Sequence, residues 1–279
     1  MAREEKLRSI SLTGLFMFSI LLSLALPAGT VSASNETTTG TITGTETWAG
    51  VHTLTGDVTI APGAKLIINP GATIEFPNGT HLDVRGSLCA GVSSCGASSN
   101  AGPAMRITLR WSEPLNSSAT GECYGMSAGN QEIWIDDPSC SEGVLMRSSI
   151  DLSETGLRYV TFDSAWGIPQ YVSAVGEFRY GALVLDGASP TLTELSFNQI
   201  NTSSVLTTNL AQPTFNGGEF VVGADASTSI VGAALQIYSS GSSVSPFTIS
   251  DITLTGTNNG CGNRDGGRHT IWAEDSFIE

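Results

Sequence analysis

The chain of 279 residues carries a formal net charge of −14 at pH 7, although only 14% of its residues are charged. This acidic balance disfavours nucleic acid and anionic membranes as partners, because both would repel a negatively charged surface. No stretch after residue 33 has the length and apolarity of a membrane span.

Residues 1–33 are predicted to be a secretory signal peptide. Three basic residues open the stretch, an apolar run follows over 12–26, and a small-residue cleavage site ends it at 31–33. A membrane anchor is the alternative, but the apolar run is shorter than a comfortable span. We therefore expect a secreted, extracellular or cell-surface protein without a transmembrane segment in the mature chain. Residues 34–45 are predicted to be a Thr/Gly-rich linker, and 46–279 one domain.

Residues 58–84 repeat a pattern of eight residues, in which two apolar positions flank one other residue. The apolar positions are Val58, Ile60, Leu66, Ile68, Ile74, Phe76, Leu82 and Val84. Because side chains alternate along a strand, each apolar pair faces one side and the residue between them faces the other. Three of these four middle residues are polar, which is typical of a solvent-facing side: Thr59, Ile67, Glu75 and Asp83.

The loops "APGA" and "NPGA" put Pro and then Gly before the next strand, and these two loops lack the Asn-Gly or Asp-Gly pair of tight hairpins. A chain that turns the same way at each corner closes a coil of three strands, or 24 residues, and stacked coils form a parallel β-helix. Eight inward side chains contribute about 12–24 kcal/mol, less than the cost of ordering roughly thirty residues at about 1–2 kcal/mol each. A single coil is thus unstable, and we expect Leu82–Val84 to lie directly over Val58–Ile60.

Residues 91–145 depart from this repeat and are predicted to form an irregular, loop-rich insertion. Two strand-like stretches stand out within it, at 105–111 and 132–137. The strand pattern returns over 156–200 and again over 231–257, where Ser-Pro precedes alternating apolar residues. We expect four to six coils in total, and an uncapped last coil that is typical of a chain truncated at its C-terminus.

The five cysteines favour disulfides, because these are the default in a secreted chain. Proximity along the chain suggests the pairs Cys89–Cys95 and Cys123–Cys140, although spacing alone leaves the connectivity open. Cys261 is left over. None of the spacings matches a zinc site.

Residues 47–92 resemble the opening coils of secreted right-handed parallel β-helix proteins of the pectin-lyase-like superfamily. The resemblance rests on Trp48, on the Pro-Gly turns and on the element Gly86-Ser87-Leu88-Cys89-Ala90. It implies an all-β, right-handed solenoid. It does not fix the activity, because the superfamily contains polysaccharide lyases and hydrolases together with non-catalytic adhesins and surface-layer proteins.

The residues give little support to either enzymatic class. A lyase would need clustered aspartates for calcium and an arginine base, and Asp136–Asp137 matches such a stretch only in passing. A hydrolase would need paired aspartates, for which Asp163, Asp186 and Asp251 are candidates because each lies near the edge of an expected strand. For all of these residues, a solvated outer position is the favoured interpretation.

The densest polar cluster after the leader lies near the C-terminus. It consists of Asn263, Arg264, Asp265, Arg268 and His269. This cluster is a candidate ligand site for a carbohydrate or an ion, and a loop that closes one coil is the favoured alternative. His52 and His81 stand alone beside expected strands, where surface positions are expected.

The sequence therefore favours a secreted or cell-surface β-helix without catalytic activity, in adhesion, glycan binding or envelope structure. Its expected partner is a polysaccharide or cell-surface glycan, and it needs no cofactor. The alternative is a carbohydrate-active β-helix enzyme, a pectate-lyase-like lyase before a glycoside hydrolase, for which calcium would be the expected cofactor. The catalytic residues of such an enzyme are not identified by the sequence.

Overall fold

The computed structural model describes residues 36–112, 141–200, 202–221, 233–242, 246–255 and 269–278, which all lie in one compact unit, residues 36–279. These residues form an all-β structure in which the helical segments are short 3-10 turns. No helix in these ranges is long and apolar enough to cross a membrane. The predicted signal peptide lies outside the described residues.

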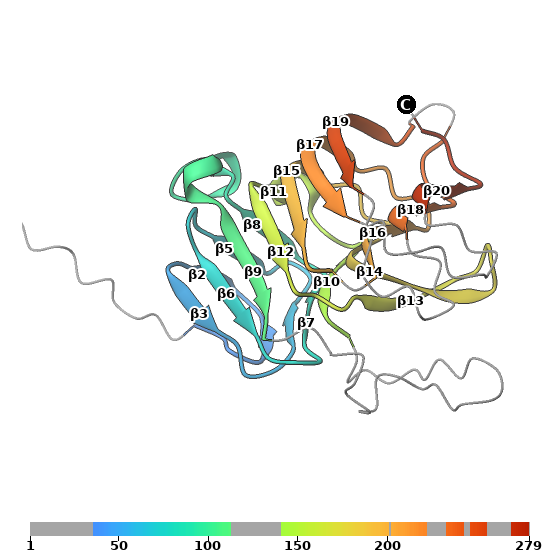
Figure 1. Ribbon diagram of the computed structural model, residues 1–279. Coiled ribbons are helices and arrows are strands. Elements are labelled where there is room, and N and C mark those ends of the chain that lie inside the picture. Colours follow the sequence, from blue (N-terminus) through green and yellow to red (C-terminus); the bar gives the residue numbers. More distant parts are fainter. Residues whose placement is uncertain are drawn as a thin grey trace, which may run out of the picture. The chain divides into compact units, whose positions relative to one another are not determined.

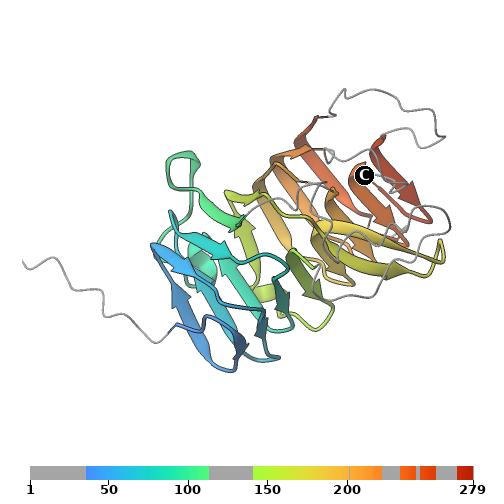
Figure 2. The ribbon, with the colours of Figure 1, turned by 60° about the horizontal axis from the view of Figure 1, so that its bottom comes forward.

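One sheet, here called sheet A, runs in the order β1-β4-β7-β10-β14-β16-β18-β20, with every neighbour parallel (Figure 1). Its strands are β1 (Gly40–Ile42), β4 (Val58–Ile60), β7 (His81–Val84), β10 (Gly143–Arg147), β14 (Glu177–Asp186), β16 (Ser203–Thr208), β18 (Ala233–Tyr238) and β20 (His269–Glu274). One further strand, β13 (Ile168–Val172), pairs antiparallel with β14. This hairpin lies at the side of the stacked strands in both ribbon views (Figures 1 and 2).

The remaining strands form sheet B, which bends in the middle. Its strands are β2 (Thr45–Trp48), β3 (Val51–Thr53), β5 (Lys65–Ile68), β6 (Thr73–Phe76), β8 (Ser87–Ala90), β9 (Ile107–Trp111), β11 (Gly156–Arg158), β12 (Val160–Asp163), β15 (Thr191–Asn198), β17 (Thr214–Val221) and β19 (Thr248–Thr255). The first half of β15 pairs with β11 and its second half pairs with β12. Two rows of short strands thus merge into single long, bent strands at β15.

The expected register of the repeat is confirmed. Val58 pairs with Leu82 and Ile60 with Val84, in parallel and 24 positions apart. The apolar pairs of β4, β5, β6 and β7 are fully buried, as the eight-residue pattern predicted. A wider interval separates Thr73 from its partner Thr108, because the loop that follows β8 lies between them.

Sheet A contains eight strands in its parallel path among the described residues, more than the expected four to six coils. Two segments account for the difference. Residues 40–42, inside the segment predicted to be a linker, form β1 and pair with β4. The expected insertion 91–145 supplies β9 and the greater part of β10, so it adds one strand to each sheet.

Aromatic side chains stack through the core along sheet B. Phe76, Trp111, Phe162, Phe197 and Phe220 follow one another with ring centroids 4.4, 6.5, 4.8 and 5.2 Å apart. All five are essentially buried. Contacts of this kind add about 0.5–1.5 kcal/mol per pair beyond the burial of area, so the stack holds successive strands in register.

Three of the corners in the later strands use a residue other than glycine. Tyr159, Glu194 and Asp251 have φ of 51°, 54° and 54°, and their flanking residues pair in register. Gly217 occupies the same corner between Glu194 and Asp251, with φ of 72°. One left-handed residue per strand therefore turns the chain at this corner. In the first repeats the corners follow the expected pattern, with glycines at positive φ.

The last strands leave their inner side only partly covered. Phe215 and Phe220 are fully buried, whereas the residues paired with them on β19, Ile249 and Leu254, are only partly buried. In β20, Ile271 is 37% exposed. Within the described residues, β19 and β20 end the two sheets.

Candidate functional site

A cluster of charged side chains spans three neighbouring strands of sheet A, and we call it the sheet A charge cluster. It consists of Asp83, Arg85, Arg147 and Asp186. Arg85 donates from Nε and Nη2 to Asp83 Oδ2 at 2.9 and 2.7 Å. Arg147 donates from Nε to Asp83 Oδ1 at 3.2 Å, and its Nη1 lies 3.5 Å from Asp186 Oδ2. The two arginines thus join carboxylates on β7 and β14.

The middle position of β7 was expected to face solvent, and for Asp83 this expectation is wrong. The residue is only 4% exposed. It points away from the core, but Arg85 and Arg147 cover it, so both carboxylate oxygens are satisfied by guanidinium groups. The hydrogen bond and the charge of Asp83 raise the pKa of Arg85 above its ordinary value, so Arg85 stays charged at any ordinary pH.

The contacts of Asp186 complete this network. Its Oδ1 accepts hydrogen bonds from Asn209 Nδ2 at 2.5 Å and from Thr208 Oγ1 at 3.4 Å. A nucleophile or general base needs a free oxygen aimed at a substrate. Asp83 and Asp186 instead have their oxygens engaged by protein donors, which is the arrangement of an ion-pair network that ties strands together.

A second polar row crosses the outer side of sheet B. Thr53, Glu75, Arg110, Asp163 and Asn198 are neighbours in register on five successive strands. Asp163 accepts from Arg110 Nε at 3.1 Å and from Asn198 Nδ2 at 2.8 Å, and Glu75 accepts from Thr53 Oγ1 at 2.9 Å. Like those of Asp186, both carboxylate oxygens of Asp163 accept hydrogen bonds from neighbouring side chains.

The structure does not bring the three candidate aspartates of a hydrolase together. Asp163 lies on β12, Asp186 ends β14 in the other sheet, and Asp251 occupies a corner of β19. Across the described ranges, no group of three or more His, Cys, Asp or Glu residues could hold a metal ion. Asp163, Asp186 and Asp251 therefore do not form the paired-carboxylate site that hydrolysis requires.

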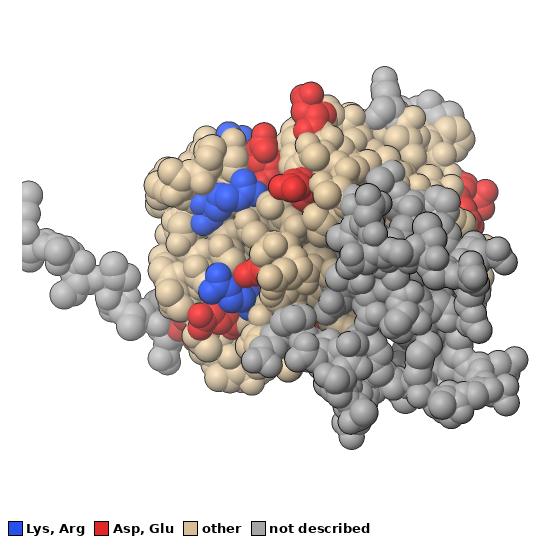
Figure 3. All heavy atoms as spheres, in the orientation of Figure 1, with Lys and Arg blue, Asp and Glu red and all other residues tan. Residues whose placement is uncertain are grey.

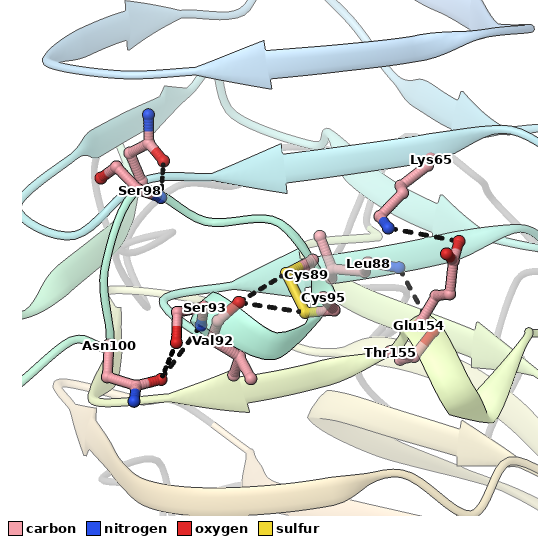
Figure 4. Close-up of a disulfide and its surroundings, with 11 residues drawn as sticks. Lys65, Leu88, Cys89, Val92, Ser93, Cys95, Ser98, Asn100, Glu154 and Thr155 are labelled. Atoms are coloured by element: carbon pink, nitrogen blue, oxygen red, sulfur yellow. Dashed lines mark hydrogen bonds and ion pairs between the residues drawn. A yellow bond between two sulfur atoms is a disulfide. The ribbon is translucent and has the colours of Figure 1, made fainter.

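The predicted disulfide between Cys89 and Cys95 is confirmed, with Cα atoms 5.8 Å apart. Figure 4 shows the loop that it closes beside β8. Ile67, Cys95 and Ala97 form a small apolar cluster with Cys89, so this loop covers Ile67. The one apolar middle residue of the repeat is therefore explained by a second, smaller core.

The loop is held by polar contacts as well. Asn100 Oδ1 accepts from the backbone N and the hydroxyl of Ser93 at 3.0 and 3.1 Å. Nearby, Lys65 Nζ lies 3.2 Å from Glu154 Oε2 (Figure 4). The backbone N of Ser98 donates to Asn69 Oδ1 at 2.9 Å, which ties the covering loop to the end of β5.

Several predicted site residues lie outside the described residues. They are Cys123, Cys140, Asp136, Asp137, Asn263, Arg264, Asp265 and Arg268. His269 begins β20, but its side chain is not among the described ones. The second disulfide and the C-terminal ligand cluster therefore stay predictions.

The surface position expected for His52 is wrong, because the residue is 4% exposed. Its ring stacks on Trp48 with centroids 4.3 Å apart, and its Nδ1 lies 2.6 Å from Glu36 Oε2. His52 pairs with the inward residue Ile74, so its place in the repeat could have indicated burial. His81 is partly buried, with Nδ1 3.1 Å from Asp57 Oδ1.

Glu142 is a buried acid that the sequence pattern did not indicate. Its side chain is fully buried, and its two oxygens accept from the backbone N–H groups of Gly79 and Trp166 at 3.0 and 2.9 Å. Burial raises the pKa of Glu142, and the two hydrogen bonds offset part of that effect. Glu142 ties the turn before β7 to the segment before β13.

Comparisons of the chain with protein-family models, with curated proteins and with solved structures found no match.

Proposed function

We propose that the chain is a parallel β-helix, related to the secreted proteins of the pectin-lyase-like superfamily that residues 47–92 resemble. The parallel register of β4 and β7 supports this proposal, because a chain can return to the same sheet in parallel only through a crossover. The regular alternation of strands between sheets A and B supports it as well.

We further propose that the protein acts without catalysis, as a secreted or cell-surface protein that binds glycans. The observation that carries this proposal is an array of uncharged polar side chains on the outer side of β15, β17 and β19, here called the hydroxyl face. It has two rows of three residues in register, Thr191–Thr214–Thr248 and Thr193–Asn216–Ser250.

The chemistry of the hydroxyl face suits a sugar chain. Hydroxyl and amide groups both donate and accept hydrogen bonds, as do the hydroxyls of a glycan. Neighbouring strands lie about 4.8 Å apart, so each row presents a polar group at that interval. All six residues are exposed or partly buried, and the paired backbones beneath them form a fixed platform.

The test is a glycan-array measurement on the full chain. Replacing Thr191, Thr214 and Thr248 by Val removes three hydroxyls while keeping the side-chain shape, and binding should weaken at least about fivefold. Thr41→Val/Thr59→Val is the matched control, because these threonines are paired neighbours on the outer side of sheet A. Unchanged binding by the triple variant, or no binding of any glycan by the native chain, would refute the proposal.

One observation favours a second candidate, a carbohydrate-active enzyme. The sheet A charge cluster places Arg147 between Asp83 and Asp186, and an arginine beside carboxylates is the composition that a lyase uses. The assay is the ultraviolet absorbance of unsaturated sugar products, with and without calcium. Turnover that chelation abolishes, and that Asp186→Asn also abolishes, would establish the enzyme in place of the binding protein.

A further inference from the structure

Two arginines flank one tyrosine at the corner between β11 and β12. The Cζ atoms of Arg106 and Arg158 lie 5.4 and 5.3 Å from the centroid of the Tyr159 ring. Both distances are within the range of a cation–π contact. Arg106 comes from the segment before β9 and Arg158 ends β11, so the corner brings together two cations that are 52 positions apart in the chain.

The protein partners of these arginines are neutral. Arg106 donates from Nε to Thr161 Oγ1 at 3.0 Å and from Nη2 to the carbonyl of Glu194 at 2.8 Å. Arg158 donates from Nε to the carbonyl of Ala101 at 3.0 Å. A guanidinium carries five N–H donors, so donors of both side chains are left for another acceptor.

Four other basic residues in the described ranges behave differently. Lys65, Arg85, Arg110 and Arg147 each lie within 4.0 Å of a described carboxylate, whereas no described carboxylate lies that close to Arg106 or Arg158. Figure 3 shows basic side chains gathered in small groups on one face, with acidic side chains beside them. Two cations at one tyrosine ring, with no described carboxylate within 4.0 Å of either, are unusual in a chain with a net charge of −14.

We propose that Arg106 and Arg158 bind an oxyanion, a carboxylate or a sulfate ester, carried on a polysaccharide. The fork of a guanidinium matches such groups with charge-assisted hydrogen bonds, and the tyrosine ring holds both side chains in place. This inference rests on the proposed glycan binding and adds the chemical class of the ligand.

The position of Arg158 connects this site with the hydroxyl face. Arg158 pairs with Thr193, which pairs with Asn216, which pairs with Ser250. Arg158 therefore extends the row Thr193–Asn216–Ser250 of the hydroxyl face by one strand. A sugar chain that lies across the strands along this row reaches the guanidinium groups with its charged substituent.

The acidic background of the protein predicts a distinctive dependence on salt. At about 0.01 M salt the Debye length is about 30 Å, so the whole negative charge repels a polyanion. At about 0.1 M it falls to about 10 Å, which screens distant carboxylates but leaves the direct contact with the arginines. At about 1 M the contact itself is screened. Binding should therefore be strongest at intermediate salt.

The experiment compares three polymers with one backbone: dextran, carboxymethyl-dextran and dextran sulfate, measured with the full chain by affinity electrophoresis. We expect one or both charged polymers to bind more tightly than dextran. The double variant Arg106→Gln/Arg158→Gln should bind the charged polymers at least about tenfold more weakly than the native chain does. Arg110→Gln is the matched control, because Arg110 is exposed and already paired with Asp163, and it should bind like the native chain.

The outcomes separate the two proposals. The oxyanion site is refuted, and glycan binding stands, if the protein binds neutral glycans on the array but binds the charged dextrans no more tightly than dextran. The same holds if the double variant binds the charged dextrans as tightly as the native chain does. If no glycan binds at all, the proposed function fails first. Arg158→Gln alone guards against misfolding, because it removes one hydrogen bond, from Nε to Ala101, and one contact with the Tyr159 ring. This variant should bind the charged polymers more weakly than the native chain, with unchanged thermal unfolding.

Discussion

Arg147 on β10 reaches back to Asp83 on β7, and its Nε donates to Oδ1 of the aspartate at 3.2 Å. The two residues are 64 positions apart in the chain, yet their strands are neighbours in sheet A. Because Arg85 takes the other oxygen of Asp83, the carboxylate is buried between two cations. Removing its charge would leave both guanidinium groups without their main partner.

Asp83→Asn should therefore destabilise the fold by about 1–3 kcal/mol, the usual cost of breaking a buried charge-assisted network. Urea unfolding followed by circular dichroism measures the change in free energy. Glu219→Gln is the control, because Glu219 is exposed and carries the same charge, and its effect should stay within about 0.5 kcal/mol. Equal effects of the two substitutions would contradict a stabilising role for the sheet A charge cluster.

The buried acid Glu142 predicts how stability depends on pH. In the folded chain its pKa is raised above the ordinary value of 4.5, so between the ordinary pKa and the folded pKa the folded state binds more protons than the unfolded state. The contribution of this group to the free energy of unfolding is therefore fully present at low pH and is lost as the pH rises through the folded pKa.

The variant Glu142→Gln cannot ionise, so it isolates this contribution. The free energy of unfolding of the native chain, minus that of the variant, should fall as the pH increases above about 4.5 and then become constant. Urea unfolding at a series of pH values measures both proteins. A difference that is flat, or that rises with pH, would show that burial does not raise the pKa of Glu142.

Adjacent side chains of β6 point to opposite sides of the sheet, so substitutions at Ile74 and Glu75 should have opposite effects on folding. Ile74 is fully buried, so Ile74→Asp would place a charge in the core and should prevent folding. Glu75 faces outward, and its contact with Thr53 is exposed, so Glu75→Ala should cost less than about 1 kcal/mol. Far-ultraviolet circular dichroism and urea unfolding distinguish the two. Similar unfolding curves would contradict the facing of this strand.

The regular part of the fold could be predicted because its signal is local. In β4 to β7 the period of eight places buried residues in phase, and Val58 and Leu82 meet as that period requires. The burial of Asp83 could not be predicted in this way, since the arginine that completes its cover comes from β10, beyond the insertion. A surface position is expected for His52 because it stands alone beside a strand, although its phase along β3 matches that of the buried Ile74.

The corners show a second limit of local patterns. Tyr159 and Glu194 adopt left-handed backbone conformations that sequence rules reserve for Gly and Asn, and only the pairing of the strands on either side imposes them. The same applies to the proposed oxyanion site. Its two arginines meet at Tyr159 because the corner and the loop before β9 come together, and nothing in their spacing along the chain indicates it.

The Pro-Gly corners of the first repeats allow a test of backbone strain without a change in packing. Gly71 has φ of 79°, and a Cβ added there would meet no atom within 4 Å. Gly71→Ala should therefore destabilise the fold by about 1–2 kcal/mol through its left-handed conformation alone. Gly102 is the matched control, because it has equally open space around it but a φ of −145°, which any residue can adopt. Gly102→Ala should leave the free energy of unfolding unchanged or slightly increased. If urea unfolding gave the same value for both variants, the corners of these repeats would not depend on the left-handed glycines.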